Sequence, residues 1–221
     1  MTRYPRTIAQ RTSVAAVLLA AAGPTTSAHP HIFADARLEI ETNDSGKIAE
    51  LRNVWRFDEI FSSSVVIDFD TNKNATMDPD ELHHVAQVVT DSLADFNYFV
   101  SLTDGGKDIK VRPPKAMVAN YDDGQLLLVF AVEPAEPVQL QGRVKVGIYD
   151  PTMYTAIDFM NDDDLVVTGP AAGKCGTQVV RPDPDEVLAQ NQASLTEAFF
   201  NDPAGTDFSK LFATRIELDC K

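Results

Sequence analysis

The residues from Asp68 to His84 (DFDTNKNATMDPDELHH) crowd carboxylate, amide and hydroxyl oxygens into a short stretch and end on two histidines. Calcium in proteins prefers an all-oxygen cage, and the EF-hand supplies one from a twelve-residue loop. Such a loop can be placed here with its first ligand at Asp70. The ligand order is then met by Asp70, Asn72, Asn74, Thr76 (through its carbonyl), Asp78 and Glu81. The stretch therefore predicts a calcium site.

One position of this loop departs from the EF-hand pattern. The sixth position is normally Gly because the chain turns there with positive φ, whereas this sequence has Ala75. A non-glycine residue in that conformation costs about 1 kcal/mol or more. With carboxylates only at Asp70, Asp78 and Glu81, we expect weak binding, with a Kd of about 10⁻⁴ to 10⁻³ M. The alternative is an acidic loop in which Asp78 caps a helix.

The four histidines form two pairs that could bind a transition metal. His29 and His31 lie two residues apart, so an extended chain places both imidazoles on one side. If the chain is cleaved before His29, this residue also gains a free α-amine. The amine and the two imidazoles could then chelate zinc, nickel, cobalt or copper. The alternative is a solvated terminus. His83 and His84 fit a solvated helix face, and would join such a site only if the N-terminal strand passed that helix.

The first 28 residues have the pattern of a secretory signal peptide. Three arginines precede the apolar run VAAVLLAAA, and the small residue Ala28 offers a cleavage point. The run is much shorter than the roughly 20 residues of a membrane span. Cleavage would leave one periplasmic domain, residues 29–221, that is not embedded in the membrane. Its net charge would be −17, against −14 for the whole chain, which argues against nucleic-acid partners.

Cys175 and Cys220 are the only cysteines. An even number of cysteines in an exported chain favours a disulfide. Two free thiols or a soft metal site are less consistent with an oxidising compartment and with the absence of nearby histidines.

The elements that must position these residues follow from hydrophobic periodicity. Strict alternation from Ile32 to Ile40 predicts a half-buried strand, and a turn at 43–46 leads to a second strand over Lys47 to Phe57. Helical spacing follows on both sides of the acidic loop, at Phe61, Val65 and Phe69 and then at Leu82, Val85, Val89 and Phe96. Strand patterns resume from Tyr98, and residues 182–212 look helical. The prediction is an α+β fold: an antiparallel β-core, an EF-hand-like helical hairpin inserted at 58–97, and a C-terminal helical segment pinned by the disulfide.

Several segments together resemble a known exported family. They are AHPHIF after the signal peptide, W-x-F-D-x-x-F, the acidic loop, YDPTMY at Tyr149–Tyr154, and the final LFATRIELDC. They are similar to the family catalogued as domain of unknown function 1007, over essentially the whole mature chain. Members are usually described as periplasmic components of uncharacterised ABC-type transport systems, some beside nickel/cobalt-type permeases. The resemblance implies metal handling at His29 and His31.

No catalytic motif accompanies these features: the sequence contains neither G-x-S-x-G nor H-E-x-x-H. We therefore expect a non-enzymatic periplasmic accessory or substrate-binding protein for divalent-cation transport, acting with a membrane permease and carrying a weak structural calcium site. The alternatives are a calcium-stabilised binding or scaffold module without a transition-metal role, and a copper-dependent enzyme.

Overall fold

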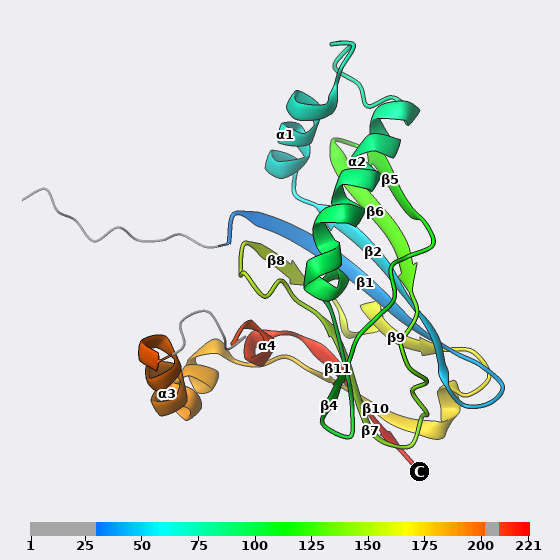
Figure 1. Ribbon diagram of the computed structural model, residues 1–221, viewed down its shortest axis with the longest axis vertical. Helices are drawn as coiled ribbons and strands as arrows, with labels where there is room; N and C mark the ends of the chain where they lie inside the picture. Colours follow the sequence, from blue (N-terminus) through cyan, green and yellow to red (C-terminus); the bar gives the residue numbers. More distant parts are fainter. Residues whose placement is uncertain (1–29, 202–207) are drawn as a thin grey trace, which may run out of the picture.

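The computed structural model describes residues 30–201 and 208–221, with side chains omitted from 194 to 201 (Figure 1). Two β-sheets are joined by connections that carry the helices. The helices are α1 (Glu59–Phe69), α2 (Pro79–Leu93), α3 (Pro184–Asn201) and α4 (Ser209–Phe212), with 3₁₀ turns η1 (Ala94–Phe99), η2 (Asp162–Asp164) and η3 (Ala172–Lys174). The strands are β1 (Ile32–Thr42), β2 (Ile48–Phe57), β3 (Val100–Asp104), β4 (Lys107–Ile109), β5 (Met117–Asp122), β6 (Gln125–Val132), β7 (Gly142–Ile148), β8 (Thr155–Asp158), β9 (Leu165–Thr168), β10 (Cys175–Val180) and β11 (Arg215–Cys220).

Antiparallel pairing dominates both sheets. The first sheet has the order β5-β6-β2-β1-β8, with β9 also on β1, and the second has the order β10-β11-β7-β3-β4. The predicted α+β class is confirmed at this level. The predicted antiparallel core is confirmed as the dominant pairing, with one exception at an edge of the first sheet, where β8 and β9 both run parallel to β1. They pair with successive halves of this long strand, beginning at Ile32 and Leu38.

The buried faces of the strands follow the predicted alternation. Ala34, Ala36, Leu38 and Ile40 of β1 are buried, and their neighbours along the strand are more exposed. Trp55 of β2 is 1% exposed, and its ring packs against those of Phe57, Phe99 and Phe130. Buried side chains of the second sheet join the same apolar cluster: Val100, Leu102, Val144, Val146, Ile148, Ile216 and Leu218. One continuous core therefore holds the two sheets together.

The hairpin of α1 and α2 lies against the first sheet, with α1 contacting β6 and α2 contacting β5 (Figure 1). Val65 and Val85 are buried, and the other predicted contact residues Phe61, Phe69, Leu82 and Val89 are partly buried against the core. Phe96 does not continue this apolar stripe. It is 41% exposed, because α2 ends at Leu93 and the chain then turns through three residues of positive φ, Asn97 to Phe99.

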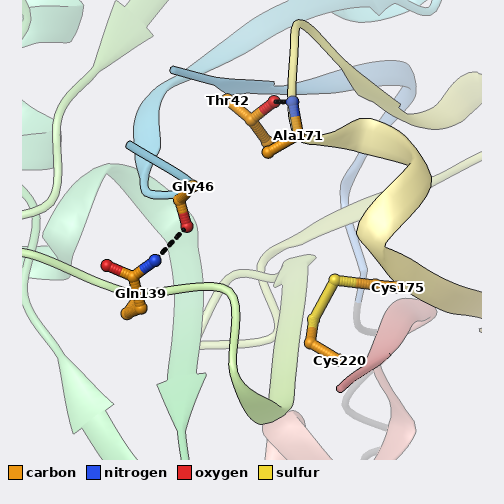
Figure 2. The surroundings of a disulfide bond; sticks show 6 residues. All are labelled: Thr42, Gly46, Gln139, Ala171, Cys175 and Cys220. Carbon is orange, nitrogen blue, oxygen red and sulfur yellow. Dashed lines mark hydrogen bonds between the residues drawn. A yellow bond between two sulfur atoms is a disulfide. The ribbon is translucent and has the colours of Figure 1, made fainter. Parts of the chain in front are cut away.

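The disulfide between Cys175 and Cys220 is present, as predicted (Figure 2). It joins β10 to β11 rather than holding a helix directly, because α3 and α4 lie in the connection between these two strands. The predicted helical segment is therefore bracketed by the cross-linked strands. In the part of the chain that the structure describes, no helix is long and apolar enough to cross a membrane.

The turn that leads into the disulfide-bearing strand is fastened to the end of β1. The hydroxyl of Thr42 donates to the carbonyl of Thr168 (2.7 Å) and accepts from the backbone N–H of Ala171 (3.0 Å; Figure 2). Gly169 is required in this turn. It has a φ of +87°, and a Cβ there would collide with the carbonyl oxygen of Thr42. This contact connects the first sheet to the segment that enters β10.

Candidate metal centre

The acidic loop connects α1 to α2, and both helices hold its ends in place. α1 ends at Phe69, directly before the first predicted ligand, Asp70. α2 begins at Pro79, where the missing N–H of proline costs no helical hydrogen bond, and Asp78 is its N-cap residue. The backbone N–H of Asp78 in turn donates to the carboxylate of Glu81 (3.0 Å). The alternative interpretation, in which Asp78 caps a helix, is therefore met by the same residues as the calcium interpretation.

Within the loop the backbone winds around the carboxylate of Asp70. This carboxylate accepts from the N–H groups of Asn74 (3.2 Å) and Ala75 (2.7 Å). Ala75 has a φ of 61°, so the turn expected at position six is present without glycine. Lys73 has the same positive φ. The loop thus stores strain at two non-glycine residues, which is of the order of 1–2 kcal/mol for each.

Glu81 ties the two ends of the loop together. Its Oε1 accepts from the backbone N–H (2.7 Å) and the hydroxyl (2.8 Å) of Thr71, and its Oε2 accepts from the N–H of Asp78. The hydrogen bond from the Asp78 backbone has the largest effect on the pKa of Glu81, and the bond from the Thr71 hydroxyl has the next largest. Both lower this pKa. The side chain is therefore an ionised carboxylate whose two oxygens both point at the loop, as a bidentate calcium ligand requires.

The remaining predicted ligands form hydrogen bonds with one another. The Nδ2 groups of Asn72 and Asn74 both donate to Oδ2 of Asp78, at 2.6 and 3.0 Å, and the amide oxygen of Asn74 accepts from the N–H of Thr76 (2.8 Å). All six predicted residues therefore belong to one compact loop. Across residues 30–201 and 208–221, however, no three His, Cys, Asp or Glu side chains are grouped to hold a metal ion. Calcium binding stays a prediction.

The predicted transition-metal residues are placed only in part. His29, like the predicted signal peptide at 1–28, lies outside the described residues. His31 is exposed just before β1. Its backbone N–H donates to the carbonyl of Tyr154 (2.8 Å), and the centre of its ring lies 5.0 Å from that of the Tyr154 ring. His83 and His84 lie on the exposed side of α2, and the ring of His84 is 5.6 Å from that of Phe69. Among the described residues, His31, His83 and His84 do not form a metal-binding group.

The turn that carries Tyr154 is built on a buried carboxylate. Asp150 is 4% exposed, and it accepts from the N–H (2.7 Å) and hydroxyl (2.7 Å) of Thr152 and from the N–H of Thr155 (2.9 Å). These bonds fix the carbonyl of Tyr154 toward the start of β1. Asp150 was not among the residues predicted from the sequence to have a role; the Asp-Pro pair followed by Thr is a turn signal that points to it.

A second carboxylate, that of Asp58, holds the start of β1 from the other side. Its Oδ2 accepts from the N–H of Phe33 (2.9 Å), and its Oδ1 accepts from those of Ile60 and Phe61 (2.9 Å each) at the first turn of α1. Partial burial acts to raise the pKa of Asp58, but these backbone donors outweigh it, so the pKa is lowered. Asp58 thus couples β1, the strand that follows His31, to the hairpin.

Family membership follows from the match between this chain and a model of known sequences. The family described as "Protein of unknown function (DUF1007)" matches residues 14–220. The chain belongs to the DUF1007 family. No curated protein matches the sequence. Three of the segments that carried the resemblance, those of His31, Asp58 and Tyr154, meet at the start of β1. The structure therefore brings together three segments that are far apart in the sequence.

Replacing Asp58 by Ala is expected to lower the free energy of unfolding by about 2 kcal/mol, because the N-cap bonds from Ile60 and Phe61 and the bond from Phe33 are lost. A carboxylate whose pKa is lowered in the folded state stabilises the protein above its unfolded-state pKa of about 3.9. The difference between wild type and variant should therefore shrink as the pH falls below about 4. Urea unfolding at a series of pH values measures this. Glu59→Gln, at the adjacent acid, should cost less than about 1 kcal/mol; equal losses in the two variants would show that Asp58 has no special role.

Proposed function

We propose that this chain is an exported protein that binds divalent cations, with a structural calcium ion in the loop from Asp70 to Glu81. The observation that carries the proposal is the fold of the loop itself. The chain turns at Ala75 with positive φ, and the backbone N–H of Ala75 donates to the carboxylate of Asp70. Both carboxylate oxygens of Glu81 accept hydrogen bonds from the two ends of the loop. An acidic helix cap alone requires only Asp78 and Glu81, and would leave the strained turn at Ala75 without a purpose.

The chemistry of the side chains fits a hard cation. Asp70, Asp78 and Glu81 offer carboxylate oxygens, Asn72 and Asn74 offer amide oxygens, and Thr76 offers a carbonyl. The amide nitrogens of Asn72 and Asn74 point at Asp78, and the amide oxygens accept from backbone N–H groups of the loop. A half-turn of each amide would break these bonds and present oxygen to an ion instead. Three carboxylates are few for such a loop, so we infer weak affinity of the kind seen in extracellular modules, with a Kd of about 10⁻⁴ to 10⁻³ M.

The second part of the proposal is transition-metal handling at His29 and His31 for a divalent-cation transport system. Its support is the position of His31, which is exposed and held against Tyr154 by a backbone hydrogen bond and a ring contact. A ligand fixed in this way loses less conformational entropy when it binds an ion. The resemblance to periplasmic components of transport systems suggests a membrane permease as the partner. A calcium-stabilised module without a transition-metal role is the alternative.

Millimolar calcium is expected to raise the melting temperature of the wild-type protein, because an ion that binds only the folded state stabilises it. Glu81→Gln should abolish the rise, since it removes the bidentate ligand. Asp80→Asn is the matched control: it removes a charge from the same helix terminus at a position outside the ligand order, so the rise should persist. Differential scanning calorimetry with and without calcium provides the measurement. A wild-type melting curve that does not respond to calcium would disprove the calcium part of the proposal.

A further inference from the structure

The outward face of α1 exposes two large apolar side chains. Ile60 is 87% exposed and Ile67 is 82% exposed, more than any other large hydrophobic residue among the described ones. Seven residues apart, they lie on the same side of the helix, two turns or roughly 10 Å from each other. The opposite side of α1 already packs on the core through Val65 and its neighbours. A helix that is apolar on both sides is normally buried on both sides.

Between the two isoleucines lie two serines whose hydroxyl groups are already occupied. Ser63 Oγ donates to the carbonyl of Glu59 and Ser64 Oγ donates to that of Phe61, at 2.7 Å each. We name the surface of Ile60, Ser63, Ser64 and Ile67 the α1 outer strip. Both hydroxyl groups of the strip already donate within the helix, so neither needs an acceptor from a partner. The two central residues are small, and small residues between larger apolar ones allow another helix to pack closely.

The acidic side chains beside the α1 outer strip favour a partner with basic residues. Glu59 and Asp68 flank it on its two sides by helical spacing, both are exposed, and neither forms a salt bridge with any described residue. From Glu59 to Asp95 the hairpin carries eight acidic residues and one basic residue, Lys73. This charge opposes docking of a second copy of the hairpin or of an anionic lipid surface. It favours an apolar surface bordered by Lys or Arg.

We propose that the α1 outer strip is the docking site for a basic amphipathic helix of a partner protein. The partner helix would lay apolar residues spaced at three, four and seven against Ile60 and Ile67 and place Lys or Arg beside Glu59 and Asp68. The strip is complete in the hairpin without an ion, so this inference does not depend on the proposed calcium site. Measurements in the presence of a chelator keep the two separate.

The test uses a labelled model helix of Leu and Lys and a peptide of the same composition whose Leu residues are scattered around the helix. Fluorescence anisotropy with EDTA should show that the wild-type protein binds the amphipathic peptide at least about tenfold more tightly than the scattered one. Ile60→Ser plus Ile67→Ser should remove this difference, while Met160→Ser plus Leu188→Ser, which truncates exposed apolar residues elsewhere, should keep it. Glu59→Lys plus Asp68→Lys should weaken binding of the basic peptide and favour one with Glu in place of Lys.

Each other outcome would overturn the proposal. Equal binding of the two peptides to the wild type would show that the strip recognises charge alone. A difference that survives in the Ile60→Ser plus Ile67→Ser variant would place recognition elsewhere. Sedimentation equilibrium showing a dimer that these substitutions dissociate would make a second copy the occupant. Partitioning onto anionic phospholipid vesicles that the same substitutions abolish would make it a membrane surface.

Discussion

Cys175→Ser together with Cys220→Ser is expected to lower the free energy of unfolding by about 4 kcal/mol, the largest stability effect we expect from a pair of substitutions. The two cysteines are 45 residues apart in the sequence. Without their bond the unfolded chain regains the entropy of a loop of this length. The loop contains α3 and α4, and Cys220 itself is buried at the end of β11. Urea unfolding of the oxidised wild type and the variant measures the difference.

Reduction of the wild type provides the matched control for this prediction. Wild-type protein in a reducing buffer should unfold at nearly the same urea concentration as the double variant, because both lack the cross-link. A loss below about 1 kcal/mol in the variant would contradict the prediction, because it would show that the disulfide adds little to the stability of the fold. Intact mass under non-reducing conditions should be two hydrogens below the reduced mass, and two alkylatable thiols in the native, unreduced protein would contradict the disulfide.

Replacing both His29 and His31 by Ala is expected to abolish binding of Zn²⁺, Ni²⁺ and Cu²⁺ while calcium still raises the melting temperature. The two kinds of ion use different ligands: imidazole and amine nitrogen bind the transition metals, whereas the loop offers oxygen. A chain extension before His29 should weaken transition-metal binding in the same direction, because it blocks the terminal amine. Titration calorimetry on a protein that begins at His29 measures these affinities.

His83→Ala plus His84→Ala is the matched control for the histidine prediction. It removes two exposed histidines that lie on α2, so transition-metal affinity should remain as in the wild type. Equal affinities with and without His29 and His31 would remove the physical basis for a role in transition-metal transport. The calcium-stabilised module would then be the better account of this chain. A loss of affinity only in the control variant would move the site to α2.

The parts of the fold that were predictable from the sequence are those whose pattern is set by a single buried face. β1 alternates between Leu38 and Ile40 inside and Glu39 outside, so its extent could be read from the residues alone. The hairpin was predictable for the same reason, since Phe61 and Val65 repeat at helical spacing on the side that meets the sheet. The turn at Ala75 was also predictable, because the ligand order places it at a position that requires positive φ.

Other features depend on contacts between distant residues and leave no local pattern. β8 and β9 pair parallel to β1 across more than a hundred residues, and nothing near Ile157 signals the direction of that pairing. Phe96 was wrongly placed on the buried stripe, because Asn97, Tyr98 and Phe99 turn the chain without a glycine to mark the turn. The meeting of His31 with Tyr154 likewise follows from topology rather than from spacing.

Isothermal titration of calcium into residues 29–221 shows whether the loop from Asp70 to Glu81 binds an ion. We expect one ion bound per chain, with a wild-type Kd of about 10⁻⁴ to 10⁻³ M. We also expect tighter binding by Ala75→Gly, because glycine adopts the positive φ of this turn without strain, and no measurable binding by Glu81→Gln. Absence of binding in the wild type, or equal affinity in all three proteins, would contradict the assignment of the loop from Asp70 to Glu81 as a cation site.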